Sequence, residues 1–463
     1  MLFDSPIYAL FLTLVVALYW RLSWRKQNGM LLACSYFFYG WWDWRFLLLM
    51  MFSTVVDYVL SKRMASSKDA VHRKTLLTIS LVLNFAFLAF FKYFNFFIDS
   101  SADFLAVLGV HNVPRSFLSV VLPPGISFYT FQEVAYIVDV YFGKLEPAES
   151  LLDYALFISL FPHLIAGPIQ RPSHLLPQVQ QPRVYESDKF FDGLMLIVCG
   201  LFRKCVIADN CAIWANAAFN GQLGSSAWTV IIGAYAFAWQ IYGDFSGYSD
   251  IARGSAQLLG FHFMVNFRQP YLAVNLQDFW RRWHISLSTW LRDYLYIPLG
   301  GSRNGEGKTY INLLTTMLLG GLWHGAHWTF VVWGAIHGGW LALERFVAGG
   351  NTPVRRWYSR AMVLGIVGLG WVLFRARSIR EAVQFLGYLS NFTWEPVYGS
   401  ALVSLAVISA LMLAIDIRTE RSGEEYPWQH RAPRRCIELA ASMLTVILFF
   451  APGQPNAFIY FQF

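Results

Sequence analysis

The stretch Leu318-Leu-Gly-Gly-Leu-Trp-His-Gly-Ala-His-Trp328 lies inside an apolar run that extends from Tyr310 to Leu343. As one helix, this run would be about 50 Å long, whereas the hydrocarbon core of a bilayer is about 30 Å thick. We therefore expect the helix to break at its glycines, Gly320, Gly321 and Gly325. A broken helix at membrane depth is tolerated only where protein buries it or where it lines a cavity. His324 should therefore lie beside a cavity.

The composition of the whole chain is that of a membrane protein. Of its 463 residues, 56% are hydrophobic and 14% are charged, whereas a soluble chain carries about 25% charged residues. The chain has too few polar side chains to cover a surface that faces water. A bilayer must therefore cover much of the protein surface. This excludes a soluble enzyme and a nucleic-acid binder. The net charge of +8 fits cytoplasmic loops that meet anionic lipid.

Apolar stretches recur along the chain and predict an all-α polytopic membrane protein with about 11–13 transmembrane helices, some shorter than a full span. Besides the run at 310–343, the candidate spans are 7–20, 29–41, 46–60, 75–98, 151–165, 190–207, 228–242, 361–374, 401–415 and 437–451. Basic loops after the first and third of these spans, and before the last, place both chain termini on the outer side. The five scattered cysteines predict no disulfide framework and no zinc site.

A second polar stretch, Leu276-Gln-Asp-Phe-Trp-Arg-Arg-Trp-His284, interrupts the apolar sequence. If Asp278, Arg281 and Arg282 faced lipid, they would together raise the free energy by about 8–10 kcal/mol, so they must face protein, water or headgroups. Asp278 and Arg282 are four residues apart and can pair on one helical face, while the tryptophans suit a membrane interface. An interfacial helix without chemistry is the alternative interpretation.

Three histidines, His324, His327 and His337, share the broken run. His324 and His327 lie three residues apart, as metal ligands on a helix can, but no acidic residue lies near them before Glu344. A site with two histidines is incomplete, so we expect no metal. The alternative for His324 is a hydrogen-bonded packing residue.

Glycine and proline mark three further breaks, at Tyr242 to Asp250, Leu122 to Gln132 and Phe161 to Gln170. The first predicts a helix stop that lines a polar vestibule; the other two suit re-entrant segments or ordinary turns. The loop Gly300 to Thr309 ends like a phosphate-binding loop, but Ser302 stands where its first glycine should be, so we reject a nucleotide-hydrolysing site. Its basic residues, Arg303 and Lys308, could still contact an anionic cofactor such as coenzyme A.

These motifs resemble the membrane-bound O-acyltransferase (MBOAT) family, in its bacterial branch of alginate O-acetylation and teichoic acid D-alanyl transfer proteins. The resemblance rests on Asp278-Phe-Trp-Arg-Arg-Trp-His284, Leu322-Trp-His-Gly325, Tyr242 to Asp250, Ala166-Gly-Pro-Ile169 and Leu122 to Gln132. It implies one integral membrane domain over residues 1–463, an MBOAT-like ring of tilted helices, with re-entrant and interfacial helices, around a central tunnel. It also implies that His324 is the catalytic histidine and His284 its second histidine. Substrate contacts are expected from Trp323, Asp278, Arg281, Arg282, Tyr242, Asp244 and Ser246.

The chain ends with Phe458-Ile-Tyr-Phe-Gln-Phe463, which resembles an acyl-transfer motif at the C-termini of polysaccharide-acetylating family members. The resemblance implies that Tyr460 carries the acyl group. The tail of residues 452–463 can extend to about 40 Å, and the bilayer midplane lies about 15 Å below the surface, so the tail can reach His324. A frayed apolar tail is the alternative.

The resemblance further implies an O-acyltransferase of the bacterial inner membrane with periplasmic termini. Its donor would be acetyl-CoA or another acyl thioester on the cytoplasmic side, with no permanently bound cofactor. Its partners would be membrane lipid, a periplasmic acetyltransferase of the SGNH-hydrolase type and a polysaccharide acceptor whose identity stays open. The alternatives are a lipid or protein acyltransferase, or a transporter or channel for acyl donor or glycan. Against a transporter, the sequence shows neither internal repeats nor paired carboxylates in its spans.

Overall fold

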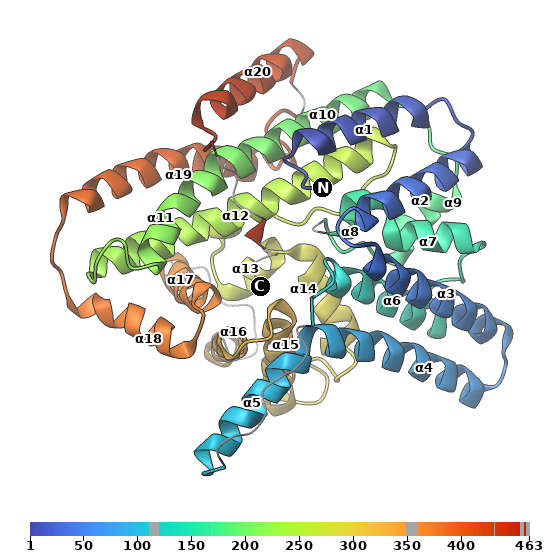
Figure 1. Cartoon of the computed structure of the whole chain (residues 1–463), viewed down its shortest axis with the longest axis horizontal. Coiled ribbons are helices and arrows are strands. Elements are labelled where there is room, and N and C mark those ends of the chain that lie inside the picture. Colours follow the sequence, from blue (N-terminus) through green and yellow to red (C-terminus); the bar gives the residue numbers. More distant parts are fainter. Residues whose placement is uncertain (111–119, 166, 349–358, 430, 454–457, 460–463) are drawn as a thin grey trace. The chain divides into compact units, whose positions relative to one another are not determined.

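The computed structural model describes residues 1–110, 120–165, 167–348, 359–429, 431–453 and 458–459. All regular secondary structure in these ranges is helical, so the expected all-α class is confirmed (Figure 1). Within them, three helical segments are long and apolar enough to cross a membrane, at 44–66, 70–107 and 396–422. The number of spans and the ring around a tunnel stay predictions.

The chain divides into two compact units, residues 1–194 with 252–264, and residues 195–251 with 265–463. The first unit contains α1 (Pro6–Tyr19), α2 (Trp24–Gly40), α3 (Trp44–Ser66), α4 (Ala70–Leu88), α5 (Phe94–Val107), α6 (Ile126–Tyr141), α7 (Leu151–Ser159), α8 (Phe161–Leu164) and α9 (Pro172–Gln180). The second contains α11 (Asp209–Phe219), α13 (Leu276–Arg282), α14 (Ile285–Leu291), α15 (Glu306–His324), α16 (Trp328–Val347), α17 (Ser359–Arg375), α18 (Ile379–Gly387), α19 (Pro396–Ser422) and α20 (Pro433–Phe450). Two helices have residues in both units, α10 (Ser187–Leu201) and α12 (Ala227–Leu258).

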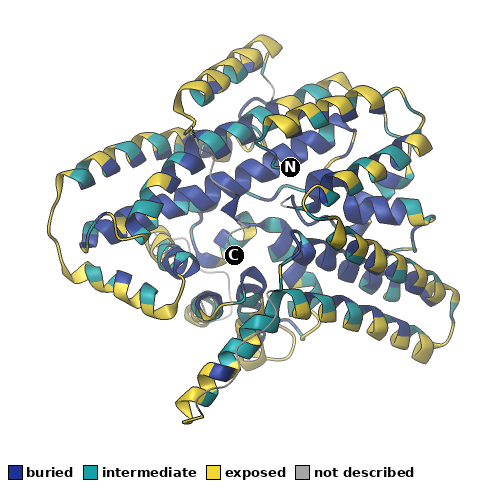
Figure 2. Ribbon diagram, in the orientation of Figure 1, coloured by how far each residue is buried: buried dark blue, intermediate teal, exposed yellow. Residues whose placement is uncertain are grey.

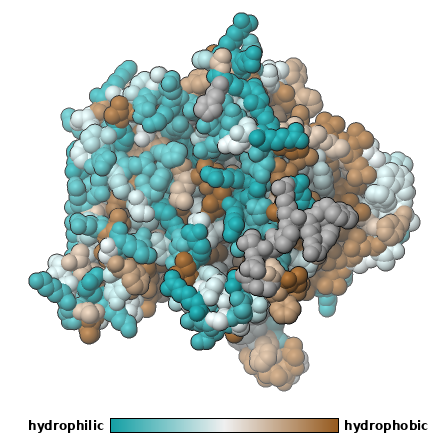
Figure 3. Space-filling model, turned by 180° about the vertical axis from the view of Figure 1, so that it is seen from behind, coloured by the Kyte–Doolittle hydropathy of each residue, from teal (hydrophilic) through white to brown (hydrophobic). Residues whose placement is uncertain are grey.

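Large apolar side chains are exposed on the outer helices, as expected of a surface that lipid covers. On α5, Phe104 is 64% and Val107 is 85% exposed, and Figure 3 shows this helix as the apolar projection at its lower edge. Leu448 and Phe449 of α20 are 83% and 80% exposed. In contrast, α6, α7 and α12 are largely buried (Figure 2). Exposed apolar patches of this kind are unusual on soluble monomers.

Two buried carboxylates lie in apolar helices of the first unit. Asp57 of α3 accepts hydrogen bonds from Ser80 Oγ at 2.5 Å and Asn84 Nδ2 at 2.8 Å, both on α4. Glu133 of α6 accepts one from Ser53 Oγ of α3 at 2.8 Å. The prediction of no paired carboxylates in the spans was wrong here, because Asp57 of the predicted span 46–60 interacts with Glu133 of α6, over which no span was predicted. These bonds supply partners for carboxyl groups that would otherwise be costly to bury.

The breaks expected at Leu122 to Gln132 and Phe161 to Gln170 are both turns at helix ends. Gly125 precedes α6 with a φ of 75°, and a Cβ there would lie 2.5 Å from the carbonyl oxygen of Leu164 at the end of α8. The two breaks therefore pack against each other, and only glycine fits at the contact.

The helix stop expected at Tyr242 to Asp250 was wrong, because α12 continues through it without a break. The glycines serve close helix packing instead. A Cβ at Gly247 would lie 2.7 Å from the carbonyl oxygen of Gly200 on α10. Local sequence favoured a break, and tertiary packing overrides it.

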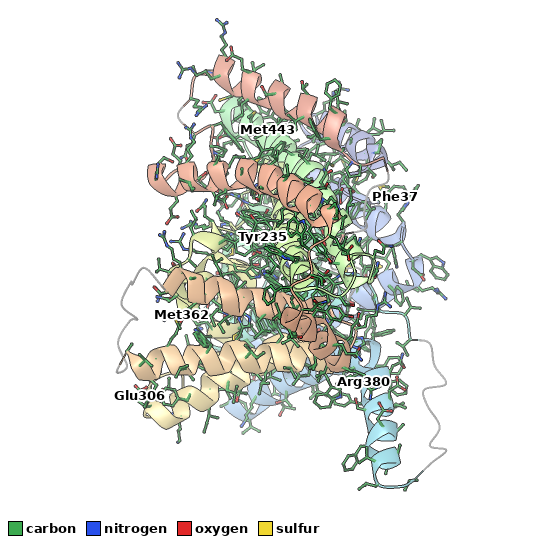
Figure 4. All side chains as sticks on the ribbon, turned by 90° about the vertical axis from the view of Figure 1, so that its left-hand side faces the viewer. Phe37, Tyr235, Glu306, Met362, Arg380 and Met443 are labelled. Carbon is green, nitrogen blue, oxygen red and sulfur yellow. The ribbon has the colours of Figure 1, made fainter. Side chains whose placement is uncertain are left out.

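The break in the run from Tyr310 to Leu343 is confirmed, because α15 ends at His324 and α16 begins at Trp328. The chain breaks only at Gly325; Gly320 and Gly321 lie inside α15, where the latter leaves room for the carbonyl oxygen of Phe330. At the far end of this helical hairpin, Arg345 Nη2 lies 2.8 Å from Glu306 Oε1. Figure 4 shows Glu306 at the start of α15.

Gly334→Ala should destabilise the protein by about 1–3 kcal/mol, the usual effect of overpacking. A Cβ at Gly334 of α16 would overlap the carbonyl oxygen of Met317 on α15. Gly339→Ala is the matched control, because Gly339 lies on the same helix with open space around it. Thermal unfolding in detergent should show a lower midpoint for the first variant only; equal midpoints would contradict the close packing.

Candidate active site

His324 is the last residue of α15 and is enclosed by aromatic rings of the second unit. Ring centroids lie 5.0 Å away for Trp323, 5.3 Å for Trp333 of α16 and 5.3 Å for Phe374 of α17. The His324 residue is 6% exposed. The break after α15 therefore holds the imidazole at a helix end, between two further helices.

His284 occupies the turn between α13 and α14 with a φ of 44°, a left-handed conformation that is uncommon for a residue with a side chain. Its Nδ1 lies 3.1 Å from Asn266 Oδ1. The same oxygen accepts the Ser286 backbone N–H at 3.2 Å and the Ser286 hydroxyl at 2.9 Å, so it is an acceptor. His284 must therefore donate from Nδ1, which leaves Nε2 as its acceptor nitrogen.

The two histidine motifs meet in space. The ring centroids of His284 and His324 lie 6.5 Å apart, and the Trp323 ring lies 6.0 Å from His284. The turn that carries His284 joins two helices of seven residues, each too short to span a bilayer. Burial lowers the pKa of the His284 imidazole below its ordinary value, so the ring is neutral at pH 7.

The other histidines of the broken run do not join this pair. His327 is exposed, and His337 is buried with its ring 4.6 Å from Trp333 and 5.5 Å from Trp280. Trp333 therefore separates His337 from His324. The described residues contain no cluster of His, Cys, Asp or Glu that could hold a metal ion.

Two of the charged residues of α13, Asp278 and Arg282, form ion pairs, whereas the third, Arg281, is exposed. Arg282 Nε lies 2.8 Å from Asp278 Oδ1, as the spacing predicted, and its Nη1 lies 2.8 Å from Glu420 Oε2 of α19. The sequence predicted that Trp283 lies at a membrane interface. Instead it is buried, and its ring lies 5.0 Å from that of Phe267. Aromatic packing inside the second unit explains the difference.

A cavity of about 590 Å³ lies beside these helices in the second unit. Its lining includes Trp280, Arg281, Ile285, Arg292, Glu344 and Arg345. Trp280 lies between the cavity and the His324 site, because it lines the cavity and its ring lies 5.7 Å from that of Trp333, which contacts His324. Arg303 and Lys308 are exposed and are not among the lining residues, whereas their neighbour Ser302 is.

The polar residues expected to line a vestibule are instead buried on α12. Tyr242 donates a hydrogen bond to Asp416 Oδ2 of α19 at 3.0 Å. Asp244 Oδ1 lies 2.9 Å from Lys204 Nζ, and Ser246 is 1% exposed. Sequence reasoning missed Asp416 and Lys204, although each is an ionisable residue within or beside an apolar run.

The C-terminal tail reaches this region of the second unit. Tyr460 lies outside the described residues, but Phe458 and Ile459 are both 0% exposed. The Phe458 ring lies 6.1 Å from that of Phe245, which in turn lies 4.6 Å from His284. The alternative of a frayed tail is therefore wrong for these two residues.

Comparisons with known proteins agree with these motifs. Residues 148–369 match the MBOAT, membrane-bound O-acyltransferase, family. The chain is 42% identical to the probable alginate O-acetylase AlgI of Pseudomonas putida, over 85% of this chain and 81% of that protein. It is 34% identical to the peptidoglycan O-acetyltransferase of Helicobacter pylori, over 83% and 79% of the two chains. It is 28% identical to the teichoic acid D-alanyltransferase of Bacillus subtilis, over 56% and 69%.

Proposed function

Because the chain belongs to the membrane-bound O-acyltransferase family and is an O-acetyltransferase of the membrane, we propose that it supplies the acetyl groups for O-acetylation of an extracytoplasmic polysaccharide. An acetyl group would pass from a cytoplasmic thioester to Tyr460 and then across the membrane to the polymer. The family membership favours this enzyme over a transporter. The observation that carries the proposal is the convergence of His324, His284 and the buried tail residue Phe458 in one unit.

In the first step, His324 acts as general base. It takes the proton of the Tyr460 phenol while the phenol oxygen attacks the thioester carbonyl. A carbon–oxygen bond forms, the carbon–sulfur bond breaks, and the proton passes from His324 to the leaving sulfur. General base catalysis of this kind contributes about 10²–10⁴-fold. Enclosure by Trp323, Trp333 and Phe374 supports this role, because the surrounding rings hold the imidazole in a fixed position, as a general base requires.

His284 is proposed to orient the reacting groups rather than to polarise the thioester carbonyl. Polarisation needs a hydrogen-bond donor aimed at the carbonyl oxygen. With Nδ1 donating to Asn266, the neutral ring offers only an acceptor at Nε2. Such an acceptor suits a hydroxyl or thiol proton.

The cavity beside α13 and α14 is proposed to receive the donor. Acyl thioesters of coenzyme A and of carrier proteins share a phosphate-bearing pantetheine arm, and arginine suits phosphate. Of the three arginines that line the cavity, Arg292 pairs with Asp293 and Arg345 with Glu306. Arg281 makes no ion pair within the described ranges and is exposed, so it is the arginine we propose for the donor phosphate. The donor is a substrate here, and no permanently bound cofactor is proposed.

The second step is proposed to occur on the outer face of the inner membrane, where both chain termini would lie. A partner acetyltransferase of the SGNH-hydrolase type would take the acetyl group from Tyr460 and pass it to a polysaccharide hydroxyl. The relatives that act on alginate and peptidoglycan support a polymer acceptor. An ester of a phenol lies between a thioester and an alkyl ester in leaving-group quality, so both transfers run downhill.

The proposal is tested by the fate of an acetyl-labelled thioester added to the chain in nanodiscs and, in parallel, to the chain in proteoliposomes. We expect release of free thiol and recovery of label on the polypeptide. Intact thioester, accumulated inside proteoliposomes without thiol release, would instead identify a transporter and overturn the proposal.

Asn266→Ala should slow acyl transfer by about tenfold or more, because a histidine held in the wrong tautomer loses much of its function. The substitution removes the acceptor for His284 Nδ1–H, while the ring itself stays. Asn266→Asp keeps an acceptor oxygen and should retain more activity. The rate of thiol release measures both variants. A full rate for Asn266→Ala, in protein of wild-type thermal stability, would contradict the orienting role.

A further inference from the structure

Three charged residues form a buried cluster in the second unit that the acyl-transfer chemistry does not use. Lys204 Nζ lies 2.9 Å from Asp209 Oδ1 and 2.9 Å from Asp244 Oδ1. All three residues are at most 2% exposed. Buried ion pairs contribute little net stability unless further hydrogen bonds satisfy their remaining atoms. The second oxygen of Asp244 therefore needs a donor.

That donor comes from the other end of the chain. The backbone N–H of Ile459 donates to Asp244 Oδ2 at 2.6 Å, across 215 positions of sequence. A hydrogen bond to an ionised carboxylate is about twice as strong as one between neutral groups. Because this hydrogen bond is made by the main chain, it fixes which residue of the tail contacts Asp244 and does not depend on the side chain at position 459.

A second contact lies one residue earlier in the tail. The Phe458 ring stacks on Tyr248 of α12, with centroids 4.1 Å apart and an interplanar angle of 29°. Asp244 and Tyr248 are four residues apart on α12, so they share one face of the helix. Phe245, beside Asp244, contacts both Phe458 and His284. Main chain and side chain of the tail are thus both held on α12, next to the histidine pair.

We propose that Lys204, Asp209 and Asp244 form a tail clamp, in which Asp244 is a positioning residue that sets the register of the C-terminal tail. Lys204 and Asp209 hold the Asp244 carboxylate, and this carboxylate binds the main chain one residue before Tyr460. Asp244 was expected to contact substrate; in this proposal it contacts the acyl carrier segment instead. The inference rests on the proposed function only for its effect on acyl transfer.

The clamp is tested first without any measurement of activity. Ile459→Cys introduces a thiol at a position that is 0% exposed. Its reaction with a maleimide, followed by mass spectrometry of the C-terminal peptide, reports release of the tail. Adding Asp244→Asn should accelerate labelling by about fivefold or more, because a neutral amide loses the charge-assisted part of the hydrogen bond. Asp250→Asn is the matched control: it removes another buried ion pair of α12, with Arg203 at 2.7 Å, and should leave labelling unchanged.

The second measurement is the rate of acetylation of the chain by the thioester. Asp244→Asn should lower the maximal rate by about fivefold or more while the KM for the donor stays constant, because the donor cavity does not include Asp244. Ile459→Pro should have a similar effect, because proline has no N–H to donate. Ile459→Val keeps the N–H and should lower the rate far less.

The outcomes separate the clamp from the proposed function. Unchanged labelling after Asp244→Asn, or equal rates for Ile459→Pro and Ile459→Val, would overturn the clamp even if the chain is acetylated. Faster labelling with no acetylation of the wild-type tail would support the clamp and overturn the role of Tyr460.

Discussion

His324→Ala should slow the release of thiol from the acetyl thioester by about 10²–10⁴-fold, which is the contribution of a positioned general base. The substitution removes the only group proposed to take the phenol proton. The ring of His284, 6.5 Å away, is held by Asn266 and should not replace it. Initial rates in nanodiscs measure the loss.

Two further variants make this prediction specific to the imidazole. His324→Gln fills similar space and should be as inactive as His324→Ala, because an amide cannot act as a base at neutral pH. His327→Ala should behave as wild type, because His327 is exposed and its side chain makes no capping hydrogen bond at the start of α16. Wild-type rates for His324→Gln, or inactivity of His327→Ala at unchanged thermal stability, would contradict the assignment.

Tyr460→Phe should abolish acetylation of the chain and stop transfer to the polymer. The variant keeps the aromatic ring and removes only the hydroxyl that forms the ester, so its fold should match wild type. The described residues next to position 460, Phe458 and Ile459, are buried and held by α12, so the variant tail should still dock. The measurement is the amount of acetyl on the polysaccharide in membranes that also contain the partner transferase.

The maleimide assay at position 459 provides the control for Tyr460→Phe. Unchanged labelling would show that the tail still docks, so that any loss of transfer follows from the missing hydroxyl. Wild-type acetylation of the polymer by Tyr460→Phe would leave only direct transfer from the thioester and would remove the relay.

The features that the sequence predicted well are those set by local chemistry. The break after His324 follows from the length of its apolar run, and the pair between Asp278 and Arg282 follows from their helical spacing. Most candidate spans are also largely helical where the structure describes them, but the span predicted at 151–165 is divided into α7 and α8 at Leu160. In these cases hydrophobicity and spacing decide the outcome, and both can be read along the chain.

The features that the sequence did not predict depend on contacts between distant segments. The glycine-rich stretch from Tyr242 to Asp250 predicted a helix stop, but α12 continues through it, and Gly247 packs closely against Gly200 instead. The tautomer of His284 depends on Asn266, and the tail contact joins residues 244 and 459. Hydrophobic periodicity carries no information about which distant donor will meet which acceptor, so these parts required coordinates.

The most direct test of the acyl relay is mass spectrometry of the C-terminal peptide after a single turnover with isotopically labelled acetyl thioester. The account predicts labelled acetyl on the phenol oxygen of Tyr460 in the wild type and none in His324→Ala. The label should then move to the polymer when the partner transferase and polysaccharide are added. A tail that stays unlabelled while the polysaccharide becomes acetylated would contradict the account.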